Sequence, residues 1–323
     1  MAIRLGRRGA LLGALAGSAV RPACAARTVH LVVGAAAGTL ADRHARAFAP
    51  FLERHLPQVY VNVVNAPGRA GLAGLEALAS APPDGSVLGW AVTPTLAARC
   101  VDSGGAADLL ERVRLIGGVM KEPIALVTRK ESALASAQDI IHRSSQNDEA
   151  VPLGTPPAGS PAHLAALRLQ AVAGVNLNIV AFPSAGAARE AALLGNVEAA
   201  MLALGEAIEA LRDGSLSGLG IAARDRAEAF PQMPPLRESG LRLSAAIRRG
   251  LAVPAAVPEA LAAGLARALR ELAEDPEFQA EADANGFIAV WLDGARWTEQ
   301  ARAEQAELGQ LWRAQPWLPA GTA

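Results

Sequence analysis

The chain has 323 residues and a formal net charge of −1 at pH 7, with 51% apolar and 19% charged residues. That balance excludes a disordered chain, and the near-neutral charge provides no basic field for nucleic acid. Aromatic residues make up only 4% of the chain, which disfavours clefts that bind sugars or single-stranded nucleic acid by ring stacking. A chain of this length is expected to form two domains.

The N-terminus has the organisation of a signal peptide. Arg4, Arg7 and Arg8 precede an uncharged apolar stretch at residues 9–20, which is too short to span a bilayer core of about 30 Å. The tripeptide Ala23-Cys24-Ala25 then offers small residues where signal peptidase reads them. We therefore expect residues 1–25 to be a signal peptide and the mature protein to be periplasmic. Sec export, twin-arginine export and a lipid anchor on the cysteine are the alternatives for this segment.

Short β-branched runs alternate with longer alanine- and leucine-rich segments at helical spacing, which predicts βα units around largely parallel sheets. The expected strands are residues 30–33, 60–64, 87–92, 124–128, 151–154, 177–182, 199–203 and 218–222. The expected helices include residues 40–52 and 72–79, one that begins at Pro258, one that begins at Asp275-Pro276, and one over residues 293–312. The predicted fold class is α/β.

Three glycine-containing loops are the most distinctive local patterns. They comprise residues 34–39, 65–74 and 154–160. The first and third loops join a strand to a helix, and the unpaired N–H groups of a helix start attract an anion. Glycine admits a ligand close to the backbone, while Thr39, Thr155 and Ser160 add hydroxyl donors. Taken one at a time, the loops are equally compatible with ordinary tight turns.

The order of these motifs along the chain resembles that in a known protein family. Residues 65–74 are similar to Asn-Arg-Pro-Gly-x-x-Gly-x-x-Gly, and Pro-Pro-Asp-Gly stands at residues 82–85. Residues 154–164 are similar to Gly-Ser-x-Gly-x-Gly-Ser-x-x-His-Leu, and residues 33–46 follow Val-Pro-Phe-x-Pro-Gly-Gly-x-Ser/Thr-Asp-x-x-Ala-Arg more distantly. Over essentially the whole mature chain, the sequence resembles the Bug family, the extracytoplasmic solute receptors of tripartite tricarboxylate transporters.

The resemblance implies a type II-like periplasmic-binding-protein fold, with two α/β lobes and a ligand cleft between them. We expect residues 26–122 and 247–323 in lobe one and residues 123–246 in lobe two, so that the first and third glycine loops face each other. The implied function is capture of a small carboxylate (a dicarboxylate, tricarboxylate or aromatic acid) for the membrane subunits of a transporter. The protein is expected to act as a monomer, without a cofactor and without enzymatic activity.

The ligand-binding residues expected from these loops, from the end of the third strand and from a crossover between the lobes near residue 248 are Ala35, Ala36, Gly38, Thr39, Thr93, Thr95, Thr155, Gly159, Ser160 and Arg248. Arg248 or its neighbour Arg249 is expected to pair with a second carboxylate, with two solvated side chains as the alternative. Pro156-Pro157 removes two backbone donors from the third loop. Leu202-Ala203 replaces the Asp-Asn pair usual in the family and offers no carboxylate to an ammonium group. Dicarboxylates and aromatic acids are therefore expected in preference to amino acids.

Other functions have weaker support in the sequence. An exported serine hydrolase needs a Gly-x-Ser-x-Gly nucleophile elbow, which the chain lacks, although Ser160 and His163 lie three residues apart. No His-x-x-x-His or Cys-x-x-Cys pair offers the spacing of metal ligands, and the glycine loops do not match a dinucleotide fingerprint. A ligand-binding sensor subunit for a membrane kinase is the alternative that the sequence does not separate from a transport receptor.

Overall fold

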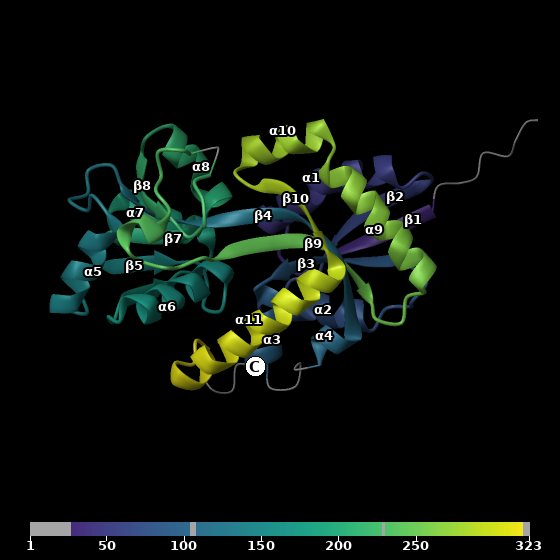
Figure 1. The fold of residues 1–323 in the computed structure, drawn as a ribbon, viewed down its shortest axis with the longest axis horizontal. Coiled ribbons are helices and arrows are strands. Elements are labelled where there is room, and N and C mark those ends of the chain that lie inside the picture. The colour runs from purple at the N-terminus through teal and green to yellow at the C-terminus, as the bar shows by residue number, and fades with distance from the viewer. Residues whose placement is uncertain (1–26, 104–107, 228–229, 319–323) are drawn as a thin grey trace, which may run out of the picture.

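The computed structural model describes residues 27–103, 108–227 and 230–318. Two α/β lobes lie side by side along the long axis of the molecule, and two long strands run between them (Figure 1). The predicted signal peptide, residues 1–25, lies outside the described residues. Within the described part of the chain, no helix is both long and apolar enough to cross a membrane.

The described strands form one hydrogen-bonded sheet in the order β2-β1-β3-β9-β4-β7-β5-β6, and β8 and β10 also pair with β4. The strands of lobe one are β1 (Arg27–Val33), β2 (Val59–Asn65), β3 (Val87–Thr93) and β10 (Ile288–Asp293). Those of lobe two are β5 (Pro152–Thr155), β6 (Asn178–Ala181), β7 (Ala199–Ala203) and β8 (Leu216–Ile221). The strands that connect the lobes are β4 (Val113–Arg129) and β9 (Ala246–Pro254).

The two connecting strands approach each other unusually closely. β4 pairs antiparallel with β9 along its first half, with register shifts on both sides of Gly117-Gly118, and then continues into lobe two to pair with β7 and β8. A Cβ atom at Gly250 would lie 2.0 Å from the carbonyl oxygen of Gly117, so no side chain fits at that position. The sequence predicted only residues 124–128 of β4, because glycines and charges interrupt the apolar pattern of its first half.

The helices flank this sheet. Those of lobe one are α1 (Leu40–His55), α2 (Leu72–Ala79), α3 (Thr95–Asp102), α4 (Leu109–Arg112), α9 (Glu259–Ala273), α10 (Pro276–Asn285) and α11 (Gly294–Ala314). Those of lobe two are α5 (Ala137–Gln146), α6 (Pro161–Ala173), α7 (Ala185–Leu194) and α8 (Leu204–Arg212). The predicted start at Asp275-Pro276 is confirmed, since the Asp275 carboxylate accepts the N–H of Glu277 at 2.9 Å.

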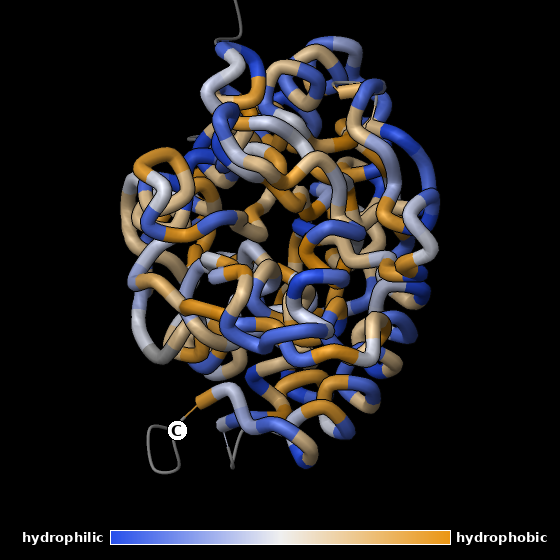
Figure 2. Tube along the Cα trace, turned by 90° about the vertical axis from the view of Figure 1, so that its left-hand side faces the viewer, coloured by the Kyte–Doolittle hydropathy of each residue, from blue (hydrophilic) through white to orange (hydrophobic). Residues whose placement is uncertain are grey.

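Each lobe has its own apolar core. In lobe one the core is aromatic: the ring of Phe48 lies 4.8 Å from that of Trp90 and 6.5 Å from that of Phe278. In lobe two it is aliphatic, with residues such as Leu153 and Met201 fully buried. Figure 2 shows hydrophobic and hydrophilic residues interspersed along the chain.

The C-terminal helix α11 contacts both lobes (Figure 1). Leu308 of α11 and the following Trp317 pack in one apolar cluster with alanines of α3 and with Leu164 of α6. The guanidinium Nε of Arg168 on α6 lies 2.9 Å from the carboxylate of Glu307 on α11. The end of the chain therefore joins the lobes a second time, at a distance from the connecting strands.

The aromatic core generates the first testable prediction. Replacing Phe278, which is fully buried, by alanine is expected to lower the free energy of unfolding by about 3–5 kcal/mol, because the cavity left behind closes only in part. Leu194→Ala is the control: this leucine is 64% exposed, and its loss should change the free energy by less than about 0.5 kcal/mol. Urea denaturation measures both, and equal losses would contradict the assignment of the core.

Candidate ligand-binding site

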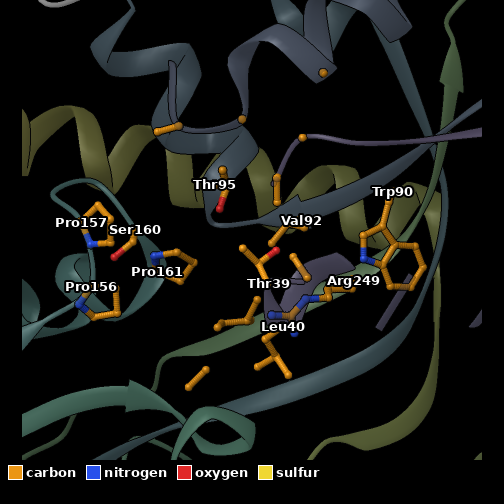
Figure 3. Close-up of a pocket in the computed structure, with 18 of the residues that line it drawn as sticks. Thr39, Leu40, Trp90, Val92, Thr95, Pro156, Pro157, Ser160, Pro161 and Arg249 are labelled. Carbon is orange, nitrogen blue, oxygen red and sulfur yellow. The ribbon is translucent and has the colours of Figure 1, made fainter. Parts of the chain in front are cut away.

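A cavity of about 490 Å³ lies between the two lobes. Its walls come from the carboxyl ends of β1, β3 and β7 and from the first turns of α1, α3, α6 and α8, the edge at which parallel sheets place ligands. Figure 3 shows Pro156, Pro157 and Ser160 on one side, with Trp90 and Arg249 on the other. The lining includes Ala35, Thr39, Leu40, Ala41, Gly71, Leu75, Trp90, Val92, Thr95, Pro156, Pro157, Gly159, Ser160, Ala203, Glu206, Ile247 and Arg249.

The start of α1 leaves two backbone donors at the cavity wall. Thr39 caps the helix in an extended conformation: its hydroxyl oxygen accepts the N–H of Asp42 at 3.4 Å, and its carbonyl accepts the N–H of Arg43 at 2.9 Å. The N–H groups of Leu40 and Ala41, which line the cavity, have no partner among the described residues. These donors and the partial positive charge of the helix start favour an anion here.

The start of α6 offers fewer donors. The hydroxyl of Ser160 accepts the N–H of His163 at 3.4 Å, and Pro161 at the first helical position has no N–H. Pro156 and Pro157 of the same loop also lack a donor, so this wall of the cavity is mainly apolar. The two glycine loops therefore face one cavity but contribute unequally to it.

Five of the ten residues expected in the site line this cavity. They are Ala35, Thr39, Thr95, Gly159 and Ser160. Gly159 has a φ of +75°, and a Cβ atom there would lie 2.6 Å from the guanidinium of Arg99 and 3.0 Å from the indole of Trp317. Only glycine fits at this position, where the third loop meets both α3 and the C-terminal segment.

The other five residues do not line the cavity, and for four of them hydrogen bonds to other groups explain their positions. The N–H of Gly38 donates to the Asp42 carboxylate at 2.8 Å, and the carbonyl of Ala36 accepts the Thr39 hydroxyl at 2.7 Å. Thr93 is buried, and its hydroxyl oxygen accepts the indole N–H of Trp297 at 3.0 Å. The remaining two are Thr155, whose hydroxyl donates to the carbonyl of Pro156 at 3.0 Å, and Arg248.

The arginine in the cavity is Arg249, which neighbours the expected Arg248. Successive side chains of a strand point to opposite faces, so only one of the pair faces the cavity. Arg249 is 4% exposed, and its guanidinium donates to the carboxylate of Glu122, a fully buried residue of β4. The other oxygen of Glu122 accepts the N–H of Gly205 at 3.0 Å. The Nε–H of Arg249 and the indole N–H of Trp90 have no partner among the described residues.

A carboxylate that the sequence interpretation missed also lines the cavity. Glu206 is half-buried in the first turn of α8, one helical turn after Ala203. Burial raises the pKa of its carboxyl, as does the negative charge of Glu122, while three neighbouring arginines oppose the rise. An acidic residue in the first turn of a helix is ordinarily explained by the helix dipole, so the sequence contains no distinct signal for this position.

His44 of α1 is buried close to the guanidinium of Arg249. Its ring contacts that of Phe287 edge to face at 5.1 Å, and neither ring nitrogen has a partner among the described residues. Burial, together with the positive charges of Arg249 and Arg43, lowers the pKa of His44 to about 2. The imidazole is therefore neutral and adds no charge to the site.

The site lacks the geometry of a hydrolase. The ring of His163 accepts the N–H of Gly159 at 3.3 Å through Nδ1, and burial lowers its pKa to about 4. Its side chain makes no hydrogen bond with the hydroxyl of Ser160 in the described structure, so the two do not form a nucleophile–base pair. Nor do the described residues contain a cluster of three or more side chains suited to a metal ion.

A cleft between two α/β lobes, with donors from helix starts, defines a solute-binding protein. The family model described as the tripartite tricarboxylate transporter family receptor matches residues 44–312. The chain belongs to this family, which confirms the Bug-like resemblance of the sequence. The family is one of receptors and not of enzymes, in agreement with the sequence-based prediction.

Individual relatives agree with this assignment. A UPF0065 protein of Bordetella bronchiseptica is 27% identical over 278 residues, which cover 86% of this chain and 81% of the relative. The solved structure of the periplasmic binding protein BugD matches with a TM-score of 0.77 at 21% identity, over 89% of this chain and 97% of that one. The structure of MatC from Rhodopseudomonas palustris with bound malate matches with a TM-score of 0.76 at 22% identity, over 88% of this chain and 98% of that one. The two structures confirm the two-lobe fold.

The buried histidine makes stability depend on pH. The unfolded chain, with a histidine pKa near 6.5, takes up a proton before the folded chain, in which the pKa of His44 is about 2. The free energy of unfolding should therefore fall as the pH drops below 6.5, by about 1.6 kcal/mol from this residue between pH 6.5 and 5. His44→Leu should remove that loss.

Urea denaturation of both proteins across this pH range measures the difference. Burial raises the pKa of Glu304 to about 6, so that group acts in the opposite sense, with stability rising as the pH falls from about 6. Since Glu304 and His163 are present in both proteins, the difference between the two curves isolates His44. Parallel curves would contradict a neutral, buried imidazole.

Proposed function

We propose that this protein captures a small carboxylate in the cavity between its lobes and delivers it to the membrane subunits of a tripartite tricarboxylate-type transporter. The observation that carries the proposal is a set of N–H donors without partners on four residues that line the cavity. They are the backbone N–H groups of Leu40 and Ala41, the guanidinium Nε–H of Arg249 and the indole N–H of Trp90. A carboxylate is the small ligand group that matches several N–H donors beside a positive charge.

The remaining walls suit the body of such a ligand. Proline, alanine, leucine and valine side chains make up most of the lining, so an aliphatic chain or an aromatic ring loses its contact with water on entry. The sequence favours dicarboxylates, tricarboxylates or aromatic acids as the ligand class. Bound malate in MatC supports a carboxylate as the ligand of this chain as well.

We also propose that the lobes divide at residues 122/123 and 246/247 and move relative to one another. In the ladder between β4 and β9, Glu122 pairs with Ile247 and Pro123 pairs with Ala246, so the two divisions lie opposite each other. Because both lobes line the cavity, a bound ligand contacts both, and binding shifts the population toward the closed form. We further propose that the signal peptide is cleaved and that the mature protein acts as a monomer in the periplasm.

Loss of one backbone donor should weaken carboxylate binding. Leu40→Pro removes the N–H of the first helical position, where proline is well tolerated because Thr39 before it is extended, with φ −71° and ψ 162°. Leu40→Ala is the matched control, since it trims the same side chain but keeps the N–H. The proline variant is expected to bind about tenfold more weakly than the alanine variant, the effect of one hydrogen bond to a charged group.

A thermal-shift screen of the mature protein against mono-, di- and tricarboxylates and aromatic acids identifies the ligand, and isothermal titration calorimetry then compares the variants. A ligand at about one hundred times its dissociation constant stabilises the fold by about 2.7 kcal/mol. If no carboxylate shifted the melting temperature, the proposed function would fail. Equal affinities of the two Leu40 variants would place the carboxylate away from α1.

A further inference from the structure

Glu206 presents a carboxylate without a partner to the ligand cavity. It is half-buried, and its side-chain oxygens take part in no hydrogen bond and no ion pair with the described residues. The lining of the cavity is mostly apolar, and none of its polar side chains, Thr39, Thr95, Ser160 and Arg249, forms a hydrogen bond or an ion pair with the Glu206 carboxylate in the described structure. An unpaired charge in such surroundings is costly unless an opposite charge arrives with a ligand.

The neighbouring cations are already engaged with other groups. Arg43 donates to the carbonyl of Gly38 at 3.0 Å, and Arg189 donates to the backbone carbonyl of Glu206 itself at 2.9 Å. Arg249 donates to Glu122. The positive charges thus lie close enough to counter the pKa rise that burial and Glu122 cause, but none forms an ion pair with the Glu206 side chain in the described structure.

The two carboxylates of this region have different roles. Glu122 is fully buried and satisfied on both oxygens, by Arg249 and by the N–H of Gly205. A Cβ atom at residue 205 would lie 2.8 Å from both Glu122 Oε1 and the carbonyl of Asn285, so the start of α8 is fixed in place. Glu122 is therefore part of the framework, and it positions Glu206 with its carboxylate available to the cavity.

We propose that Glu206 accepts hydrogen bonds from a protonated amine of the ligand, so that the receptor takes small aminocarboxylates. The proposal rests on the proposed function and narrows its ligand class. Each charge of such a ligand meets its opposite: the carboxylate meets Arg249 and the start of α1, and the ammonium meets Glu206. A dicarboxylate without an amine would instead bring its second negative charge into the cavity beside Glu206 and Glu122.

This inference replaces the expectation from Leu202-Ala203 that the cleft has no carboxylate for an ammonium group. Leu202 is fully buried within its lobe, whereas Glu206, one turn further along, lines the cavity. The carboxylate that lines the cavity therefore comes from α8, and not from the position at which the family usually has its Asp-Asn pair. A primary ammonium is the donor that fits best, because it is charged at neutral pH and carries three N–H groups.

The test compares ligands that differ only by the amine. Isothermal titration calorimetry of the mature wild-type protein uses succinate against aspartate, glutarate against glutamate, and benzoate against 4-(aminomethyl)benzoate. In at least one pair, the amine-bearing ligand should bind at least tenfold more tightly, the effect of one charge-assisted hydrogen bond. Glu206→Gln should reduce that preference about tenfold while leaving the affinity for the amine-free partner equal or higher.

Glu209→Gln is the matched control. It makes the same substitution on an exposed glutamate of the same helix, away from the cavity, and should retain the full preference. Equal melting temperatures without ligand establish that the variants are folded. An amine preference that survives in Glu206→Gln, or carboxylates that bind with no amine preference, would overturn the inference and leave the proposed function intact. If neither the amine-bearing ligands nor their amine-free partners bound, the proposed function would be overturned as well.

Discussion

The antiparallel contact between β4 and β9 is the constraint on which the rest of the molecule depends. These strands belong to both lobes, and they approach so closely that the backbone of Gly117 occupies the space of a side chain at Gly250. The same pair of strands places Glu122 beside Arg249, one residue before the glycine. The contact between β4 and β9 therefore connects the lobes, and β9 also contributes Ile247 and the positively charged Arg249 to the cavity.

The ion pair between Glu122 and Arg249 has a large effect on stability although it consists of few hydrogen bonds. Both partners are almost completely buried, and removing one member of such a pair leaves an uncompensated charge, which costs about 3–5 kcal/mol. Glu122 also holds the first turn of α8 through Gly205. The pair thus fixes the arginine that faces the ligand and the helix that carries the second charged group of the cavity.

Much of the fold follows from local sequence signals. Helix starts such as Asp275-Pro276 and the glycine loops at residues 34–39 and 154–160 are determined by capping and by backbone freedom, which neighbouring residues specify. The side chains that reach the cavity depend on more than local signals. Whether Arg248 or Arg249 faces inward is decided by the phase of β9, which its pairing with β3 and β4 sets. The position of Glu206 likewise depends on distant residues, because Glu122, which lies 84 positions earlier in the chain, bonds the N–H of Gly205 at the start of α8.

The second connection between the lobes, made by α11 and Trp317, has a consequence for the opening and closing of the proposed cleft. The indole N–H of Trp317 donates to the buried carboxylate of Asp102 on α3 at 2.7 Å, and Leu308 packs against Leu164 of α6, so the C-terminal segment contacts both lobes. If the lobes open as proposed, these contacts must break, so they favour the compact form and lower the conformational penalty on affinity. For a receptor that works as proposed, the strength of these C-terminal contacts would therefore set a compromise between tight capture at low solute concentration and release of the ligand.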